Sequence, residues 1–458
     1  MRAVLAAAAL WASLARAQEG PRSATSLTQQ GVPGGKRTLV LLQEAQTQAT
    51  HSNFFRGLAD RGHELSFALA SDKELSLYEH GERLFDNLCL FAPNAAAFGA
   101  QSADDVLGFL RDGGNVLLTG DVTTSDPVRR LAAEVGIDLD ESDSQVIDHA
   151  SYDYELSAVV SRGATPLKHV LGEAAGPGTE VRFRGIGHAV SEDNYLAVPI
   201  LVGNPTTFSA APGAAIEDYP ENIGADTLLV SGVQGHNNAR LAFCGSLALF
   251  SDAFGYAGNE AFANGLGKWA FNEAGVLQYS NVTHSRVDGS PPELLLKQKD
   301  KPDLPYSLFP DPEITRNSLV YRIKDTLRYE VTIREWDAEA GDWRPFDADD
   351  VQLEFVMLDP FIRTTLESDG RGTFSTSFMA PDTYGIFKFK LLYRRPGYST
   401  LHVEKVVSVR PFKHNEYDRY ITSAYPYYTT AFVMMAAVAA FSYMFLFTED
   451  KVVLLKQD

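Results

Sequence analysis

Arg37-Thr-Leu-Val-Leu-Leu42 is a strand-like segment that ends in four consecutive apolar residues. A strand with one buried face alternates apolar and polar residues, whereas a strand buried on both faces reads as a continuous apolar run. The segment therefore predicts a central strand of a parallel sheet that helices cover on both sides. Next along the chain, Asn53–Arg61 has the apolar spacing of a helix, which Gly62 is expected to end.

The same alternation of strands and helices continues to about Gly275. Further strands are expected at His63–Ala70, Phe85–Phe91, Asn115–Thr119, Thr227–Gly232 and Arg240–Cys244, and further helices at Ser102–Arg111 and Glu260–Glu273. Strands that alternate with helices are typical of parallel β-α-β units. Residues 36–279 are therefore predicted to form an α/β domain with a doubly wound, mostly parallel sheet.

Beyond Gly275 the helical spacing disappears and proline-rich turns take its place. Turns at Ser290-Pro-Pro292, Lys301-Pro302 and Pro310-Asp-Pro312 indicate that residues 280–325 are a linker and the start of a β region. Segments with a period of two follow at Leu327–Arg334, Val351–Leu358, Gly372–Phe378, Gly385–Tyr393 and Leu401–Val409. Residues 326–411 are predicted to form a β-sandwich domain. The expected core of this domain includes Trp336, Trp343, Phe355 and Phe387.

The uncharged segment Thr429–Thr448 is long enough to cross a membrane. A helix needs about twenty apolar residues to span the hydrocarbon core, and a helix satisfies its backbone hydrogen bonds within one segment. Tyr425, Tyr427 and Tyr428 precede it, where aromatic rings favour the membrane interface. The sequence thus predicts a juxtamembrane segment over 412–428, a transmembrane helix over 429–448 and a short tail over 449–458.

Residues 1–17 have the features of a secretory signal peptide. Met1-Arg2 is positively charged, the apolar run Ala3–Leu14 is too short to span a bilayer, and Ala15-Arg16-Ala17 matches a signal-peptidase site. Cleavage after Ala17 would leave a polar segment over 18–35 at the new N-terminus. A signal peptide followed by one transmembrane helix predicts a single-pass type I membrane protein. Most of the chain is then translocated, and the tail stays in the cytosol.

Composition disfavours some classes of partner. The 458 residues carry a formal net charge of −19 at pH 7, which argues against nucleic acid and against an anionic membrane surface as partners. The two cysteines, Cys89 and Cys244, lie in strand-like apolar runs, so buried free thiols are expected. A Cys89–Cys244 disulfide stays an alternative if the two strands bring the α-carbons within bonding range.

Motifs of soluble enzymes are missing from the sequence. It contains no G-x-S-x-G, G-x-G-x-x-G, Walker A, H-E-x-x-H or paired C-x-x-C motif. An amidotransferase-like domain would need a cysteine nucleophile at a turn after a strand, and Leu118-Thr119-Gly120-Asp121 has none. No residue is therefore assigned a catalytic, cofactor-binding or metal-binding role.

Three polar clusters are weaker candidates for a site. Asp138-Leu139-Asp140 matches the D-x-D by which many glycosyltransferases hold a metal ion, but its acidic surroundings favour a solvated loop. Asp148-His149 could form an acid–base pair, although neighbours on a strand point to opposite faces and a structural role is favoured. His236-Asn-Asn-Ala-Arg240 could bind a polar ligand at the carboxyl edge of the sheet, but turn chemistry also explains its asparagines.

Seven segments carry a resemblance to a known family. They are Thr50–Arg56, Phe85–Leu88, His236–Arg240, Asp349–Val356, Asp359–Thr364, Val409–Pro411 and Ser423–Tyr428. Together they resemble the 48 kDa subunit family of the oligosaccharyltransferase, in the family's order, over residues 36 to 447. The chain departs from the family after Phe250-Ser-Asp252, where Ala253-Phe254-Gly255 replaces paired aromatic residues.

The resemblance implies a subunit of a complex in the membrane of the endoplasmic reticulum. That complex transfers a preassembled oligosaccharide from dolichyl diphosphate to asparagine in Asn-x-Ser/Thr sequons, and its catalytic metal belongs to a different, multi-spanning subunit. This chain is then expected to be a non-catalytic scaffold without a cofactor, with the other subunits as partners and the dolichyl-linked oligosaccharide as a further contact. Two alternatives stay open: a stand-alone glycan- or peptide-binding receptor, and a D-x-D glycosyltransferase.

The sequence also predicts a glycosylation site and a contact face. Asn281-Val282-Thr283 is the only sequon expected on the luminal side, and its polar surroundings predict an exposed asparagine that carries glycan. In the apolar segment, Ala436 and Ala440 are four positions apart and share a helix face. Small residues let membrane helices approach closely, so this face is expected to contact another membrane helix. Chance is the alternative, because alanine is common in this chain.

Overall fold

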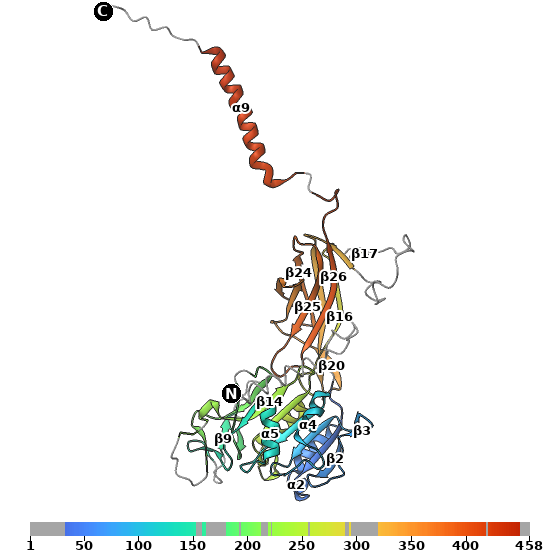
Figure 1. The fold of residues 1–458 in the computed structure, drawn as a ribbon, viewed down its shortest axis with the longest axis vertical. Helices are drawn as coiled ribbons and strands as arrows, with labels where there is room; N and C mark the ends of the chain where they lie inside the picture. Colours follow the sequence, from blue (N-terminus) through green and yellow to red (C-terminus); the bar gives the residue numbers. More distant parts are fainter. Residues whose placement is uncertain are drawn as a thin grey trace, which may run out of the picture.

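The computed structural model describes residues 33–152, 158–161, 180–191, 194–211, 219–220, 222–254, 257–288, 293–294, 319–417 and 420–448. These residues form an N-terminal α/β domain, a β domain and a long C-terminal helix (Figure 1). The signal peptide expected over 1–17 and the tail expected over 449–458 lie outside the described residues. The proline turns at 290–292, 301–302 and 310–312 also lie outside them.

The N-terminal domain is built on a nine-stranded sheet. Its strands in spatial order are β2 (Glu64–Leu69), β1 (Arg37–Leu42), β5 (Asn87–Phe91), β6 (Asn115–Thr119), β15 (Arg240–Cys244), β14 (Leu228–Gln234), β11 (His188–Val190) and β7 (Ile137–Leu139), with β12 (Ala197–Val202) also paired with β14. The first five strands are parallel, whereas the remaining pairings are antiparallel. The expected doubly wound, mostly parallel sheet is confirmed, with an antiparallel half beyond β15.

Three two-stranded sheets surround the main sheet. They are β3 (Tyr78–Glu79) with β4 (Glu82–Arg83), β8 (Gln145–Asp148) with β13 (Thr207–Ala210), and β9 (Ala158–Ser161) with β10 (Glu180–Phe183). They belong to connections between the main strands and extend the domain at its margins.

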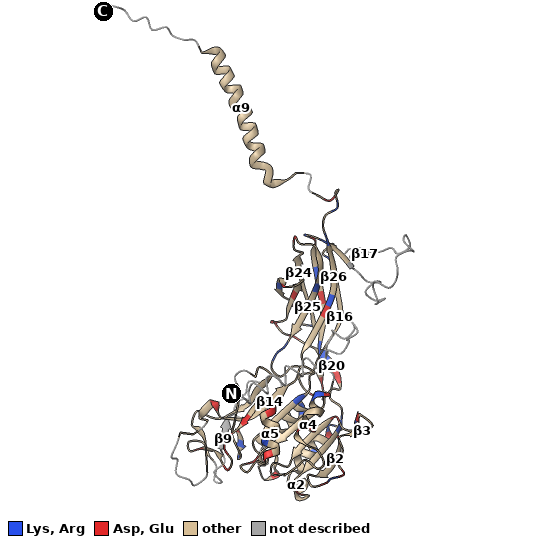
Figure 2. Ribbon diagram, viewed as in Figure 1, with Lys and Arg blue, Asp and Glu red and all other residues tan. Residues whose placement is uncertain are grey.

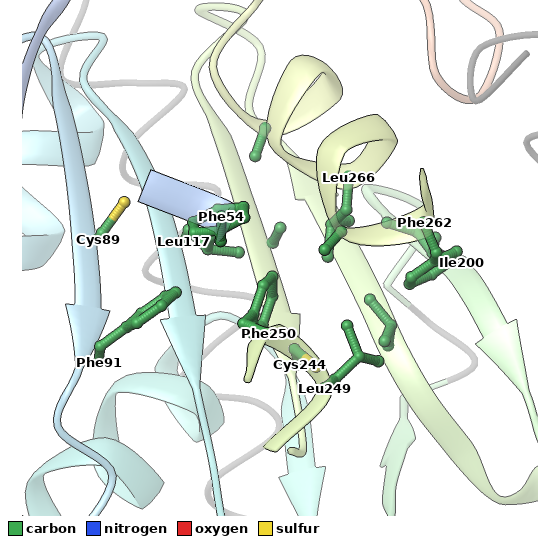
Figure 3. Close-up of a cluster of buried hydrophobic side chains, with 14 of the residues drawn as sticks. Phe54, Cys89, Phe91, Leu117, Ile200, Cys244, Leu249, Phe250, Phe262 and Leu266 are labelled. Atoms are coloured by element: carbon green, nitrogen blue, oxygen red, sulfur yellow. The ribbon is translucent and has the colours of Figure 1, made fainter. Parts of the chain in front are cut away.

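Helices cover both faces of the main sheet. They are α2 (Gln46–Thr50), α3 (Ser52–Asp60), α4 (Ala103–Arg111), α5 (Asp126–Glu134) and α7 (Ala257–Ala270). Val40 and Leu42 of β1 share a buried core with α3 and α7, shown in part in Figure 3. Leu39 and Leu41 point the other way and share a second core with α4 and α5. Successive side chains of a strand alternate between the two faces of its sheet. The continuous apolar run of β1 is therefore explained by its burial on both faces of the sheet, as predicted.

Local chemistry sets the ends of two helices. Ser102 precedes α4 and forms a capping box: its Oγ accepts a hydrogen bond from the Asp105 amide (3.3 Å), and the Asp105 carboxylate accepts one from the Ser102 amide (2.8 Å). Gly62 follows α3 with a φ of 86°. A residue with a β-carbon rarely adopts this left-handed conformation, so glycine ends the helix there, as predicted.

The β domain consists of two packed sheets. The first contains β16 (Leu277–Arg286), β19 (Thr326–Asp337), β20 (Asp342–Pro345), β23 (Glu367–Ser368) and β24 (Thr373–Met379). The second contains β17 (Glu293–Leu294), β18 (Leu319–Arg322), β21 (Gln352–Val356), β22 (Pro360–Thr365), β25 (Gly385–Tyr393) and β26 (Leu401–Arg410). Their inner side chains form one buried core, in which Phe355 and Phe387 stack with centroids 4.6 Å apart. The expected sandwich is confirmed.

Trp336 and Trp343 do not lie in this core, and that prediction is wrong. Both are half-buried on the β19–β20 hairpin, where they stand opposite each other and pack edge to face at 5.3 Å. Each indole covers part of the other, so the two side chains bury part of their apolar surface against each other outside the core of the sandwich.

The β domain also begins earlier than the sequence indicated. Strand β16 starts at Leu277 and pairs with β19 as far as Arg286, so residues 280–286, which were expected in the linker, are strand. A bulge between Ser280 and Thr283 explains the difference. An extra residue in one strand shifts the alternation of apolar and polar positions, which hides the period of two in the sequence.

The last described element is α9 (Tyr425–Phe447), a helix of 23 residues. Within Thr422–Phe447, a window of 18 residues has a mean hydropathy of 2.0, and α9 carries no charged side chain (Figure 2). At 1.5 Å per residue α9 is about 35 Å long, enough to cross a hydrocarbon core of about 30 Å. It lies apart from both domains in Figure 1. The helix starts at Tyr425, so the tyrosines predicted to precede it form its first turn.

Candidate functional site

In an open parallel sheet, ligands bind where the carboxyl ends of the strands meet. Here that edge carries the start of α3, after β1, and the segment Phe250-Ser-Asp252, after β15. Asp252 accepts hydrogen bonds from the Ser52 amide (3.0 Å), the Ser52 hydroxyl (2.8 Å) and the Asn53 amide (3.0 Å). Burial would raise the pKa of Asp252, but these hydrogen bonds hold it below its usual value. The chain's own carboxylate therefore occupies the helix terminus that an anionic ligand would use.

The space beside this carboxylate is small. A cavity lined by Asn53, Asn259 and Asn264, among others, has a volume of about 20 Å³, which is room for about one water molecule. His51 is buried nearby, and its Nε2 lies 3.2 Å from the Leu247 carbonyl oxygen. Burial lowers the pKa of His51, which keeps the imidazole neutral at pH 7. Internal contacts thus fill this part of the edge, and a sugar ring does not fit.

In an amidotransferase-like domain, the turn after β6 would carry a cysteine nucleophile. Asp121 stands there; its carboxylate accepts a hydrogen bond from the Val122 amide (2.8 Å), and its own amide donates to Thr124 Oγ1 (3.0 Å). A side chain that caps its own turn is held by the backbone. These hydrogen bonds give Asp121 a role in shaping the turn, and the turn carries no cysteine that could act as a nucleophile.

The two cysteines are buried, free and on different strands. Cys89 lies on β5 and Cys244 on β15, with β6 between them, and Figure 3 shows Leu117 of β6 in the gap. Adjacent strands are about 4.8 Å apart, so two strand spacings exceed the roughly 7 Å that a disulfide allows between α-carbons. The alternative of a Cys89–Cys244 bridge is therefore wrong. Burial raises the pKa of both thiols, to about 12 for Cys244, so they stay protonated at neutral pH.

The two carboxylates of the D-x-D motif do not converge. Asp138 is exposed on β7, whereas Asp140, just beyond the strand, is buried and accepts a hydrogen bond from Asn222 Nδ2 (2.5 Å). Asp138 is exposed to solvent, as predicted, but it lies on a strand and not in a loop; Asp140 is buried, so the prediction is wrong for it. Asp140 turns inward because Gly187 leaves room: a β-carbon there would lie 2.4 Å from Asp140 Oδ2. One exposed and one buried carboxylate cannot jointly hold a metal ion, and the described ranges contain no cluster of three or more candidate metal ligands.

Asp148 and His149 have the structural role that was favoured. Asp148 is buried and accepts hydrogen bonds from Asn204 Nδ2 (3.0 Å) and Thr206 Oγ1 (2.7 Å). Burial would raise the pKa of Asp148, but these bonds lower it. His149 packs on Phe208 at 5.5 Å, away from the carboxylate's partners. The two residues therefore hold together the two-stranded sheet of β8 and β13.

The turn that precedes β15 lies at the amino edge of the sheet, so its expected place at the carboxyl edge is wrong. Because β14 is antiparallel, it returns the chain to the edge where the parallel strands start. Asn237 Nδ2 donates to the carbonyls of Leu110 and Arg111 at the end of α4 (2.8 and 2.9 Å). Asn238 has a φ of 64°, and its Oδ1 accepts a hydrogen bond from the Thr400 amide of the β domain (2.9 Å). Turn chemistry and a contact between domains explain both asparagines.

Arg240, the last residue of this segment, joins the two domains. It is fully buried and donates to the carbonyls of Trp269 (2.8 Å), Ala274 (2.6 Å), Gly275 (3.0 Å) and Gly397 (3.2 Å). Trp269 Nε1 donates to the same Gly397 carbonyl (3.1 Å). Burial lowers the pKa of Arg240 to about 9, so it is still cationic at neutral pH. The sequence analysis named Arg240 only as part of a candidate ligand-binding turn and missed its role between the domains, for which the only signal was an arginine that opens an apolar strand.

A second buried ion cluster lies at the same edge of the sheet. Glu273, just after α7, accepts hydrogen bonds from Lys36 Nζ (3.0 Å), Arg61 Nε (2.9 Å) and His63 Nε2. These partners belong to the start of β1, the end of α3 and the start of β2. The carboxylate therefore fastens the C-terminal helix of the domain to its first two strands. The sequence placed Glu273 only at the end of a helix, and nothing local indicates its partners.

The remaining predicted sites are both exposed. Asn281 lies at the bulge of β16 with its residue exposed and a φ of 48°. Ala436 and Ala440 lie one helical turn apart on α9, where they face no other described part of the chain. These positions permit modification and helix contact, respectively, and both assignments stay predictions.

The fold and these sites define the class of protein: two domains joined by buried hydrogen bonds and followed by a helix long enough to span a membrane, with no cluster of three or more metal-ligating side chains within the ranges that the structure describes. A family model described as "OST48, N-terminal domain" matches residues 29–273, and one described as "OST48 middle domain" matches residues 311–449. The chain belongs to the OST48 family.

Relatives from distant organisms span nearly the whole chain. The dolichyl-diphosphooligosaccharide–protein glycosyltransferase 48 kDa subunit of Danio rerio is 39% identical, covering 93% of this chain and 95% of its own length. The subunits of the same name from Arabidopsis thaliana (36%; 91% and 93%) and Drosophila melanogaster (38%; 90% and 92%) are similar to the same extent. A solved structure of a Niemann-Pick type C2 protein from Japanese carpenter ant covers 29% of this chain and 91% of its own, with 6% identity and a TM-score of 0.16, too low to support a conclusion.

Proposed function

We propose that this chain is a non-catalytic scaffold subunit of the oligosaccharyltransferase complex, which transfers oligosaccharide from dolichyl diphosphate to asparagine in Asn-x-Ser/Thr sequons of nascent proteins. The observation that carries the proposal is the similarity to one subunit family over nine-tenths of the chain. The interdomain junction around Arg240 supports it, because a body that holds its partners in place must itself be rigid.

The proposal includes a location and partners. The chain lies in the membrane of the endoplasmic reticulum as a single-pass type I protein, with both domains in the lumen. Its partners are the other subunits of the complex, including the multi-spanning catalytic subunit, and the dolichyl-linked oligosaccharide is a further proposed contact. No cofactor is assigned to this chain. The matching relatives and the single apolar helix support the membrane location.

The proposed domain boundaries follow the sequence with two adjustments. They are a signal peptide over 1–17, a polar segment over 18–35, the α/β domain from 36, a linker within 280–325, the β domain to 411, a juxtamembrane segment from 412, a transmembrane helix to 448 and a tail over 449–458. Strand β16 supports moving the start of the β domain to Leu277, and α9 supports starting the membrane helix at Tyr425.

Purification from native membranes tests the proposed function. A scaffold subunit is expected to leave the membrane in mild detergent together with fixed partners, and to lack transfer activity when separated from them. Within the complex, Asp138→Asn should keep activity to within about two-fold, because Asp138 is exposed and exposed substitutions change stability by at most about 0.5 kcal/mol. An isolated chain with its own transferase activity would support the D-x-D glycosyltransferase instead. A partner-free chain that binds glycan would support the stand-alone receptor.

We expect Asn281 to carry an N-linked glycan, since its side chain is exposed at a bulge that a transferase can reach. Treatment with an N-glycosidase should then increase the electrophoretic mobility of the native chain in one step. Asn281→Gln and Thr283→Ala should migrate like the treated protein, whereas Thr283→Ser keeps the sequon and should migrate like the untreated one. An untreated native chain that co-migrates with Asn281→Gln would contradict the prediction.

We also expect α9 to contact another membrane helix through Ala436 and Ala440. Replacing both with leucine adds bulk at the close-packed face while it preserves hydrophobicity, so the chain should insert normally but lose membrane-embedded partners during purification. Met434→Leu with Val438→Leu is the matched control, because these residues are also four apart but lie on the opposite face. Equal recovery of partners with both double variants would show that the helix is only a tether.

A further inference from the structure

The segment that follows the last strand of the β domain is fastened to that domain. Arg410 donates from Nη1 and Nη2 to the two carboxylate oxygens of Glu416 (2.7 and 2.8 Å), and the Lys413 amide also donates to Glu416 (2.8 Å). Phe412 packs against the sandwich core, with the Arg322 guanidinium 5.2 Å above its ring. Residues 411–417 therefore fold back onto the end of the domain, and we call them the clip.

The clip shortens the connection between the β domain and α9. Tyr417 contacts Phe412 at 5.4 Å and ends the clip, and α9 starts at Tyr425, eight positions further on. Eight residues span at most about 28 Å when fully extended. Residues Thr422–Ala424 form a turn of 3₁₀ helix, which rises only about 2 Å per residue, so the true reach is shorter. When α9 spans the membrane, this end of the β domain lies close to the bilayer surface.

An apolar rim surrounds the same end of the β domain. It consists of Leu358, Phe361, Met379, Tyr384 and Ile386, which are between 44% and 89% exposed. The strand register places them together. Gly385 pairs with Val409 at the exit of β26, and Val356 pairs with Lys388 near the start of β25, so the β21–β22 turn and the connection from β24 to β25 open towards the clip. Figure 1 shows these strand ends on the side of the domain that leads to α9.

We propose that this rim rests in the interfacial layer of the membrane and holds the β domain upright on the bilayer. Five large apolar side chains gathered at one end of a domain cost free energy in water, and the clip keeps them within reach of lipid. Tyrosine and aliphatic side chains together suit the membrane interface, which has the hydrocarbon core on one side and hydrated headgroups on the other.

Two basic side chains beside the rim have acidic partners. Lys324 pairs with Asp382 (3.0 Å), and Arg410 pairs with Glu416. Attraction to anionic lipid therefore contributes little, and the contact depends on buried apolar area. The consequence is mechanical, since the rim and α9 fix the β domain at two places and so fix the height and tilt of the α/β domain above the membrane.

The test measures lipid contact in the full chain within its native complex, reconstituted into phosphatidylcholine vesicles. Tyr384→Cys would be labelled with an environment-sensitive fluorophore; Cys89 and Cys244 are fully buried and do not compete for the label. Ala340→Cys is the control, because it is exposed at the β19–β20 hairpin at the opposite end of the β domain. A quencher attached near the lipid headgroup should reduce the fluorescence at position 384 at least two-fold more than at position 340. The difference should persist at high salt.

Three results would overturn the proposal. Equal quenching at both positions would place the rim in water, and a blue-shifted label at 384 that lipid quenchers do not reach would place it against a partner protein. The third result is unchanged quenching at 384 when Leu358, Phe361 and Ile386 are all replaced with serine. The proposal rests on α9 spanning the membrane, so resistance to alkaline extraction is measured on every variant. Loss of the chain from the membrane would refute the anchor itself and is distinguishable from an unquenched rim on an anchored chain.

Discussion

Arg240→Met is expected to destabilise the chain by about 3–5 kcal/mol, the usual effect of removing one side of a buried charged network. The guanidinium donates to four main-chain carbonyls, and Gly397 among them belongs to the other domain. Methionine has a similar length but no donor. The Ala274 carbonyl then loses its side-chain partner, at about 1–3 kcal/mol if water cannot reach it, and the carbonyls of Trp269, Gly275 and Gly397 each lose one of two hydrogen bonds.

The loss cannot be recovered by apolar packing. Replacing every member of a buried ionic network with apolar residues is often neutral, because no polar group is left behind. Here the acceptors are backbone carbonyls, which no substitution removes. Arg240→Lys should lie between the wild type and Arg240→Met, since one ammonium group keeps the charge but has three donors and cannot span the two directions in which Nη1 and Nη2 point.

Urea unfolding of the detergent-solubilised full chain measures this effect, together with protease cleavage at the junction between the domains. Arg130→Met is the matched control: Arg130 pairs with Asp104 on the surface, with both side chains more than 60% exposed, and such pairs contribute about 0–1 kcal/mol. Equal unfolding midpoints for the two variants would show that Arg240 does not hold the domains together.

Glu273→Gln is expected to lower stability at pH 7 by about 3 kcal/mol and to remove a pH dependence that the wild type shows in acid. Burial of Glu273 acts to raise its pKa, but hydrogen bonding from His63 and the charge of Arg61 outweigh it and lower the pKa to about 2. Its ordinary value is 4.5. A difference of about 2.5 units corresponds to about 3 kcal/mol of stability at pH values above both.

The sign follows from which state binds the proton. The folded pKa is below the unfolded one, so the unfolded chain binds the proton first as pH falls. The stability that Glu273 contributes is complete above about pH 4.5 and is lost as pH falls from there to about 2. Glutamine keeps the shape but carries no charge, so the contribution is missing at every pH.

Urea unfolding midpoints at pH 7, 4.5 and 3 compare the two proteins. We expect the wild type and Glu273→Gln to differ most at pH 7 and by less than half as much at pH 3, because the contribution disappears only as pH falls to about 2. Glu339→Gln is the control, since Glu339 also pairs with a lysine but is 81% exposed, and its substitution should have little effect at any of the three values. A difference that stays constant from pH 7 to pH 3 would show that Glu273 acts through shape and not through charge.

Elements whose cause is local could be predicted from the sequence. The run at Arg37–Leu42, the capping residue Ser102, the glycine at 62 and the apolar length of α9 each depend on a few neighbouring residues. Periodicity, caps and span length are properties of such short windows, so the fold class and the membrane helix followed from them. The absence of catalytic motifs was also visible in the sequence.

Tertiary structure alone decided which distant residues meet. A continuous apolar run fits parallel and antiparallel central strands equally well, so the direction of β14, and with it the edge that carries His236–Arg240, was not determined locally. The partners of Glu273 lie more than 200 positions away, and Asp252 caps a helix 200 positions earlier. Asp140 is buried because Gly187, on another strand connection, leaves it room. Each of these contacts forms only after the chain has closed a long loop. No short stretch of sequence therefore contains both of the residues that meet.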